Sequence, residues 1–433
     1  MLDDTIVALA TARGRSGVAV VRVSGPGAFA AAKALSGRAP VAGRPRLRPL
    51  RDPGSGEMLD RGLVLAFRGP GSFTGEDVVE FQVHGSPAVT GAIVDALAAL
   101  PGVRSATPGE FSRRALENGR LDLTQVEGLG DLIASETASQ RRLALRAMEG
   151  AVSRRGARWR EAMVEALAFL EASIDFADEE LPAGLFDSAA ATLAGVEAEM
   201  AQELAGSAAA ERVREGFEVA LIGPPNVGKS TLLNMLAQRD VALTSETAGT
   251  TRDVLEVRLD LGGLALTLLD TAGLRDAGEV VEAMGIDRAR RRAAAADLRV
   301  FLVEDAPQAD GLGVAREADD IVVLAKADLR PLPVGGAVSG TTGLGVEQLL
   351  GRIADILGVR VAAAGLVSHR RQREAIERAR ARLSAARRAI EDGGGEIAAE
   401  EIRAALRALD FLLGSVDVEA VLDAVFRNFC LGK

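Results

Sequence analysis

The most constraining feature of this sequence is a glycine-rich string between an apolar run and a helical one. FEVALIG (217–223) has the pattern of a buried strand, GPPNVGKST (223–231) follows it, and LLNMLA continues as a helix. Gly, four residues and then Gly-Lys-Ser is the spacing of a phosphate-binding loop between a strand and a helix. The string therefore predicts a parallel doubly wound sheet that holds a nucleotide by its phosphates.

The residues of this loop have separate predicted roles. Gly223 and Gly228 let the main-chain N–H groups turn inward around the phosphates, and Lys229 neutralises the β and γ oxygens. Ser230 offers its hydroxyl to Mg²⁺. A chance match without a bound nucleotide is the alternative, which the strand before and the helix after disfavour. The predicted nucleotide contacts here are Gly223, Asn226, Val227, Gly228, Lys229, Ser230 and Thr231.

Two further strings complete the predicted phosphate site. LALTLLD (264–270) predicts a buried strand that ends in DTAG, which places Asp270 near the magnesium and Gly273 near the γ-phosphate. Thr251, in TAGTTRD, is the predicted second magnesium ligand once its loop closes over the γ-phosphate. An ordinary sheet with polar turns is the alternative. The predicted contacts are Ser245, Glu246, Thr247, Ala248, Gly249, Thr250, Thr251, Asp270, Thr271, Ala272 and Gly273.

The choice of base is predicted to lie in IVVLAKAD (321–328). GTPases usually have Asn-Lys-x-Asp here, and the Asp accepts hydrogen bonds from guanine and so excludes adenine. Lys326 and Asp328 are in place, but Ala325 replaces the Asn. Losing one side-chain hydrogen bond costs about 1 kcal/mol, so we expect weaker affinity with the guanine preference retained. Ser339 is the predicted contact from the last base loop.

The rest of the chain divides into segments of different pattern. Residues 1–118 mix short β-rich runs with Gly and Pro, which predicts an α+β domain. Residues 119–212 and 363–433 predict helices that close into one bundle around the inserted nucleotide-binding domain, residues 213–362. The expected fold is multidomain, α/β and α. In the first segment strands are predicted at 18–25, 61–67 and 76–85 and helices at 28–35 and 89–100.

Composition excludes several kinds of protein. A net charge of -10 argues against nucleic-acid binding by overall electrostatics, so any RNA contact must be local. The absence of tyrosine disfavours an aromatic platform for unpaired bases. No apolar run could span a bilayer, no secretory signal is visible, and Cys430 is the only cysteine. We therefore expect a cytoplasmic protein without a membrane span or an internal disulfide.

Further strings carry a specific resemblance. The combination of GPPNVGKS, TAGTTRD, DTAGLR and the terminal FCLGK is similar to the bacterial tRNA-modification GTPases of the MnmE (TrmE) family, of the TrmE-Era-EngA-YihA-Septin-like class. The likeness includes DTIVALAT, GVAVVRVSG, SFTGEDVVEFQVHG and PGEFSRRALENGRLDL, and so covers essentially the whole chain.

The resemblance implies how GTP would be hydrolysed. Potassium is expected beside the phosphates, where it supplies the positive charge that an arginine finger supplies elsewhere. Its expected ligands are Asn226, Ser245, Thr247 and Thr250, once two GTPase domains of a homodimer meet.

Positioning of the attacking water falls to another residue. Leu274, where many small GTPases have Gln, cannot orient water. The resemblance gives this role to Glu282, against the alternative of a solvated glutamate at a helix start. Arg275 is either a switch contact or a surface arginine. The catalytic candidates are therefore Glu282, Arg275, Asn226 and Lys229.

For the first domain the resemblance implies dimerisation and binding of 5-formyltetrahydrofolate or methylenetetrahydrofolate. The family's contacts map onto Arg22, Glu80, Arg120 and Lys433, and Arg120 replaces the more usual Lys. A carboxylate such as Glu80 can accept hydrogen bonds from the pterin edge, and cations suit the glutamate tail. An ordinary surface charge is the alternative for each residue.

The resemblance also implies an activity. With an FAD-binding partner protein like MnmG (GidA), the GTP hydrolase would take part in adding a carboxymethylaminomethyl-type group to C5 of the wobble uridine of certain tRNAs, using a folate one-carbon unit. One alternative is a regulatory GTPase switch that assembles ribosomes or other complexes without modification chemistry. The other is an ATPase, which the departure at Ala325 would permit.

Three further features leave alternatives open. Cys430 is interpreted as structural rather than nucleophilic, because no histidine neighbours it. His84 is interpreted as structural, and His369 as a helix start without an evident role. The arginines of 369–388 either contact tRNA or lie on a solvated helix face that covers the bundle. They are Arg370, Arg371, Arg373, Arg378, Arg380, Arg382, Arg387 and Arg388.

Overall fold

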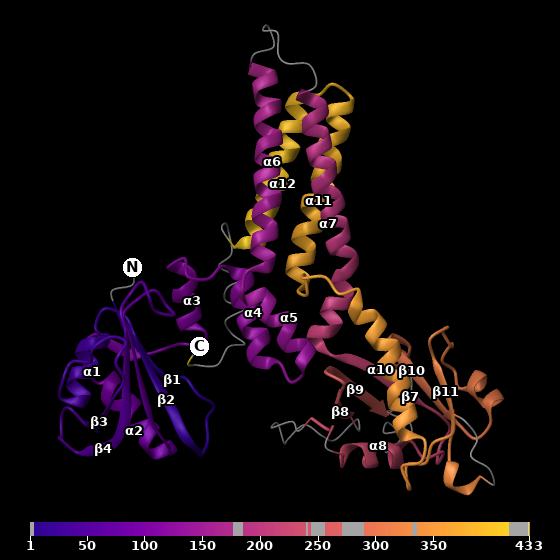
Figure 1. The fold of residues 1–433 in the computed structure, drawn as a ribbon, viewed down its shortest axis with the longest axis horizontal. Coiled ribbons are helices and arrows are strands. Elements are labelled where there is room, and N and C mark those ends of the chain that lie inside the picture. Colours follow the sequence, from indigo (N-terminus) through magenta and orange to yellow (C-terminus); the bar gives the residue numbers. More distant parts are fainter. Residues whose placement is uncertain are drawn as a thin grey trace, which may run out of the picture. The chain divides into compact units, whose positions relative to one another are not determined.

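The chain forms two compact units in a computed structural model, which describes residues 4–175, 185–239, 241–243, 256–270, 290–330, 336–414 and 432. One unit comprises residues 1–130 and 409–433, and the other comprises residues 131–408 (Figure 1). The end of the chain therefore belongs to the same unit as its beginning. The finer boundaries expected at residues 118, 212 and 362 remain predictions.

The first unit is built on a six-stranded sheet with the order β3-β4-β5-β2-β1-β6. Neighbouring strands are antiparallel, except that β1 and β6 are parallel. The predicted strands at 18–25, 61–67 and 76–85 are confirmed as β2, β4 and β5. The strands are β1 (Thr5–Leu9), β2 (Ser16–Ser24), β3 (Arg46–Arg51), β4 (Met58–Phe67), β5 (Val78–Gly85) and β6 (Val103–Ser105).

Two helices, α1 and α2, cover one face of this sheet, and polar side chains of β2 and β5 lie on the other. Val21 and Val23 of β2 are buried in one apolar core with α1 and α2. Because side chains alternate along a strand, Arg22 lies on the opposite face, and the same alternation in β5 puts Glu80 there. Both predicted helices are confirmed. The helices of this region are α1 (Ala28–Ser36), α2 (Pro87–Ala98), α3 (Glu110–Glu117) and α4 (Leu123–Ala134).

Long helices from both ends of the second unit form a bundle, as predicted. α7 packs against α6 and α11, and α12 is tied to α6 by the ion pair between Arg403 and Glu171 (Figure 1). In the described part of the chain no helix is long and apolar enough to cross a membrane. The helices are α5 (Ala138–Met148), α6 (Ala151–Asp175), α7 (Leu185–Glu215), α11 (Arg370–Glu391) and α12 (Gly395–Leu413).

Some arginines of α11 pair with other helices of this bundle. Arg373 pairs with Glu211 at 2.7 Å, and Arg387 pairs with Glu197 at 2.8 Å, both on α7. Arg382 pairs with Glu401 on α12, so three of the eight arginines tie neighbouring helices together. Neither sequence interpretation, tRNA contact or a solvated face, included such pairs. The arginines of α11 that carry no such pair remain candidates for other contacts.

The inserted domain is the predicted doubly wound sheet, with the order β11-β10-β7-β9-β8. Its strands are parallel except β8, which runs antiparallel to β9. The apolar strands and the two helices α8 and α10 share one core. The elements are β7 (Phe217–Ile222), α8 (Lys229–Ala237), β8 (Glu256–Leu261), β9 (Leu264–Asp270), β10 (Leu298–Val303), β11 (Ile321–Leu324) and α10 (Val346–Ala362).

Candidate functional site

The glycine-rich loop lies at the carboxyl end of β7 and leads into α8. A side-chain carbon at Gly223 would lie 2.2 Å from the Leu302 carbonyl oxygen, so glycine is required there. Asn226 and Gly228 have left-handed φ angles of 59° and 112°, which turn the chain into the helix that starts at Lys229. The unpaired N–H groups of a helix start favour an anion, and they lie here at the predicted phosphate position.

Lys229 lies over this loop. Its Nζ donates to the carbonyl oxygens of Gly223 at 2.8 Å and Pro224 at 2.9 Å, and the residue is almost fully buried. An ammonium held in this way can exchange these acceptors for phosphate oxygens. Val227 is buried in the core of the sheet, so only its main chain is available to a nucleotide.

Ser230 and Asp270, both predicted near magnesium, are in contact. The Ser230 hydroxyl donates to Asp270 Oδ2 at 2.9 Å. Asp270 is the last residue of β9, which pairs directly with β7, and it is buried. A hydroxyl and a carboxylate oxygen side by side are the hard oxygen ligands that suit Mg²⁺. The donor set of the described residues thus fits the expected ion.

The predicted base-binding string follows β11. Ala325 is 1% exposed, so its methyl group fills a buried position where the usual string has a polar amide. Lys326 has a φ of 57° and pairs with Glu304 at 2.7 Å. Asp328 is exposed, and its carboxylate has no partner among the residues that the structure describes. It is therefore available to the edge of a base.

The second base loop packs on the phosphate loop's helix. The Ser339 hydroxyl accepts the N–H groups of Thr341 and Thr342 at 3.2 Å each, which shapes the loop. A side-chain carbon at Gly340 would lie 2.6 Å from the Leu232 nitrogen, so the loop touches the first turn of α8. The predicted base loop therefore lies beside the helix that follows the predicted phosphate loop.

Part of this predicted site lies outside the described residues. Of the expected potassium ligands only Asn226 is described, and it is exposed on the loop. The water-positioning, potassium and switch roles thus remain predictions, as does the structural role of Cys430. The predicted residues outside the described ranges are Ser245, Glu246, Thr247, Ala248, Gly249, Thr250, Thr251, Thr271, Ala272, Gly273, Arg275, Glu282 and Lys433.

A second candidate site lies on the face of the first unit's sheet that is opposite α1 and α2. Arg22 and Glu80 are directly opposite each other in β2 and β5, and Arg22 Nε lies 2.9 Å from Glu80 Oε1. The guanidinium lies 5.4 Å from the Phe73 ring centre and 5.6 Å from that of Phe111. Sequence reasoning missed both phenylalanines. Phe111 is fully buried and Phe73 is exposed, so only Phe73 offers a ring beside the charged pair to a flat heterocycle.

Two other predicted residues come from the same unit. A side-chain carbon at Gly75 would lie 3.1 Å from Arg120 Cγ, so Arg120 lies against the loop between β4 and β5. A side-chain carbon at Gly432 would lie 2.1 Å from the Leu9 carbonyl oxygen at the end of β1. The last described residue before Lys433 therefore packs beside the strand that pairs with β2.

A buried ion network, also missed from sequence, supports this unit. Arg114 is 1% exposed, and its Nη2 lies 2.7 Å from Asp4 Oδ1 and 3.1 Å from Glu110 Oε1. Burial raises the pKa of Glu110, but hydrogen bonds from Arg104, the Thr107 backbone and Arg114 outweigh it and lower the pKa to about 2. Nothing in the local sequence spacing marks Arg114 as different from a surface arginine.

His84 and His369 each contact an aspartate. His84 Nδ1 lies 2.8 Å from Asp60 on β4, and His369, the residue before α11, lies 2.8 Å from Asp131. The His84 side chain is largely exposed, whereas that of His369 is partly buried. The structural role of His84 remains a prediction.

Comparisons with known proteins match nearly the whole chain to one family. Residues 5–120 match the family model described as GTP-binding protein TrmE N-terminus, and residues 123–430 match the one described as MnmE helical domain. A tRNA modification GTPase MnmE of Ruegeria pomeroyi is 54% identical, covering 99% of this chain and 100% of that protein. The protein of the same name from Dinoroseobacter shibae is 53% identical over the same shares.

Among solved structures, the G domain of the T. maritima FeoB iron transporter is 24% identical, with a TM-score of 0.23, over 32% of this chain and 97% of that one. This likeness is too low to indicate a shared fold or function. The full-length relatives and the two family models, together with the phosphate loop, show that the chain belongs to the MnmE family of tRNA modification GTPases.

Proposed function

We propose that the chain binds GTP at residues 223–231 and hydrolyses it in the service of tRNA modification. The observation that carries this proposal is the contact of Ser230 with Asp270 beside Lys229, at the ends of two paired strands. The relatives' shared name supports the tRNA part. With Mg²⁺ and radiolabelled GTP the purified chain is expected to release phosphate. Folded protein that takes up no GTP would exclude the proposal.

In this mechanism the described residues bind and orient the nucleotide. Lys229 contacts the β and γ oxygens in place of its present carbonyl partners, and the N–H groups at the start of α8 surround the phosphates. Ser230 and Asp270 hold Mg²⁺, whose chemistry is to neutralise charge on the phosphate oxygens. Asp328 accepts hydrogen bonds from guanine. Glu282 is proposed to position the attacking water.

Potassium is proposed as the activating ion. Asn226 supports this, because it is exposed on the loop at a left-handed φ of 59°, next to the phosphate position. Hydrolysis is expected to be faster in potassium than in sodium chloride, and Asn226→Ala should remove this difference while GTP still binds. Equal rates of the unaltered chain in both salts would exclude the role.

Activation is proposed to follow pairing of two GTPase domains within a homodimer. Closure of the switch loop in that pair would complete the ion's ligand set. Sedimentation with GDP and a transition-state mimic, in potassium, should show the closed form. Identical sedimentation with and without the mimic would argue against pairing.

The tRNA chemistry is proposed to be carboxymethylaminomethyl-type modification of the wobble uridine at C5, shared with an FAD-binding partner like MnmG. Mass analysis of tRNA nucleosides from cells that lack the chain should show loss of that modification. Unchanged wobble uridines would instead favour a regulatory GTPase switch.

The first unit is proposed to bind the folate carrier and to dimerise. The support is the Arg22–Glu80 pair, whose guanidinium lies near the exposed Phe73, with Arg120 on a neighbouring loop. Glu80→Gln is expected to weaken binding of 5-formyltetrahydrofolate, followed by fluorescence, since an amide cannot hold two ring donors as a carboxylate does. Unaltered affinity would remove Glu80 from the site.

A further inference from the structure

A polar cleft lies in the second unit where the chain leaves the GTPase domain. It has a volume of about 580 Å³, within the range of small-molecule sites. Arginines of α5 and α6 line one side, and α7 with the segment 362–366 lines the other. The arginines are Arg146, Arg155 and Arg158.

One of these arginines is already neutralised within the protein. Arg155 pairs with Glu203, which is 3% exposed. The same carboxylate accepts the N–H groups of Leu366 and Val367, the latter at 3.0 Å. Glu203 therefore has a full set of partners and adds little negative charge to the cleft.

The other two arginines have no such partner. Within the described ranges neither Arg146 nor Arg158 forms an ion pair or a side-chain hydrogen bond, although both line the concave surface. The second acid of the cleft, Glu199, accepts from Trp159 Nε1 at 2.9 Å. The cleft thus carries three arginines against two glutamates, a small local excess of positive charge in a chain whose net charge is -10.

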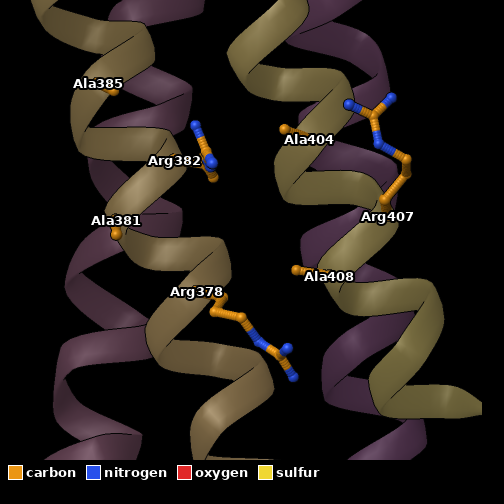
Figure 2. Close-up of a pocket in the computed structure, with 7 residues that line it drawn as sticks. All are labelled: Arg378, Ala381, Arg382, Ala385, Ala404, Arg407 and Ala408. Atoms are coloured by element: carbon orange, nitrogen blue, oxygen red, sulfur yellow. The ribbon is translucent and has the colours of Figure 1, made fainter.

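A second basic concavity differs in that two of its arginines form ion pairs. Figure 2 shows Arg378 and Arg382 on α11 and Arg407 on α12, beside a groove of about 540 Å³. Arg382 pairs with Glu401 at 3.1 Å and Arg407 with Glu400 at 3.0 Å. An anion in that groove would have to displace these carboxylates from the arginines, whereas Arg146 and Arg158 have no ion pair within the described ranges to give up.

We propose that this cleft binds a phosphate group of the tRNA backbone, with Arg146 and Arg158 as its donors. The planar fork of arginine matches two phosphate oxygens. The two side chains come from different helices, so they can hold one phosphate from two directions. The choice of tRNA rests on the proposed function. A contact at one or two phosphates is also the local kind of RNA contact that the acidic chain permits.

The test compares two double variants of the full chain. Arg146→Ala with Arg158→Ala removes the cleft's donors, and Arg380→Ala with Arg388→Ala removes the same charge from α11. Arg380 and Arg388 are exposed, line neither concavity, and have no ion pair within the described ranges. The probe is a fluorescently labelled unmodified tRNA transcript, titrated at several potassium chloride concentrations.

The cleft variant is expected to bind the transcript about tenfold more weakly and to lower the slope of log K against log salt by about 1. The α11 variant should change affinity less than about twofold. Arg146→Lys with Arg158→Lys should recover part of the loss, since it restores the charge without the planar fork. Equal losses in both alanine variants would overturn the proposal, because they would reflect net charge alone.

Two further readouts separate the possible failures. GTP hydrolysis without tRNA is expected to be unchanged in both alanine variants. If the unaltered chain hydrolyses no GTP, that result counts against the proposed function and not against the cleft. Inorganic phosphate supplies the second source of the same anion. If the cleft variant binds the transcript normally but loses stabilisation by inorganic phosphate in thermal melting, the cleft belongs to free phosphate and the tRNA proposal fails.

Discussion

Ala325 is the residue at which the nucleotide site departs from the usual GTPase pattern. Restoring the amide by Ala325→Asn is expected to tighten GDP binding by about fivefold, the equivalent of one hydrogen bond of about 1 kcal/mol. Ala325 is almost fully buried, so the larger side chain must be accommodated. Isothermal titration gives the affinity, and thermal melting without nucleotide serves as the control. Lower affinity at unchanged melting temperature would show that the site no longer uses this position.

Ser230 is the residue on which the magnesium prediction depends. Ser230→Ala removes the hydroxyl that donates to Asp270, so the variant should need more Mg²⁺ and hydrolyse GTP on the order of 10²-fold more slowly. Ser230→Thr keeps a hydroxyl and should recover most of the rate. Initial rates over a magnesium titration measure both. If Ser230→Ala keeps the magnesium dependence of the unaltered chain, Ser230 is not a ligand.

Sequence alone predicted residues whose type the phosphate chemistry demands. Gly223, Lys229 and Ser230 follow from spacing, because a phosphate loop tolerates few other residues there. Phe73 and Phe111 could not be found in this way, since their contact with Arg22 joins parts of the chain that are far apart in sequence. Contacts of that kind depend on the packed sheet and carry no local signal.

Among the elements, α7 is held closely against the segment that leaves the GTPase domain. A side-chain carbon at Gly206 would lie 2.6 Å from the Gly365 nitrogen and 2.8 Å from the Ala363 carbonyl oxygen. Backbone atoms cannot move aside as a flexible side chain can. Gly206→Ala is therefore expected to lower the melting temperature by several degrees, a cost of about 1–3 kcal/mol.

Gly195 on the same helix is the matched control. A side-chain carbon there would meet nothing within 4 Å, so Gly195→Ala should be neutral or stabilise the helix by about 0.5–1 kcal/mol. Differential scanning calorimetry of both variants gives the comparison. Equal effects of the two substitutions would mean that the close approach at Gly206 does not matter for stability.

Whether a strand could be predicted from the sequence depends on how many of its side chains are buried. β5 and β9 were predicted because long apolar or alternating runs bury their side chains. β3 was not predicted: RLRPLR has one fully buried residue, Leu50, and contains a proline, as edge strands can. β6 is only three residues long. Such strands are formed by pairing with their neighbours rather than by their own sequence.

At the scale of the whole molecule, the proposed ligands and the charge networks differ between the two units. GDP contacts only residues of the second unit in the proposed site. GDP should therefore stabilise that unit and raise its unfolding temperature. At a hundredfold excess over the dissociation constant, the free energy of unfolding should rise by about 2.7 kcal/mol. Hydrogen exchange with mass spectrometry can assign protection to each unit. Equal protection in both units would show that they unfold together.

Acid should act first on the other unit. The pKa of Glu110 is lowered from its ordinary 4.5 to about 2, so its ion pairs stabilise the first unit above pH 4.5. That stability is lost as the pH falls from 4.5 towards 2, because the unfolded chain takes up a proton before the folded one does. Burial raises the pKa of Asp297 in the second unit, so protonation of this group at low pH favours the folded state. In Glu110→Gln the exchange of the first unit should depend less on pH over this range, and an unchanged dependence would place the acid sensitivity elsewhere.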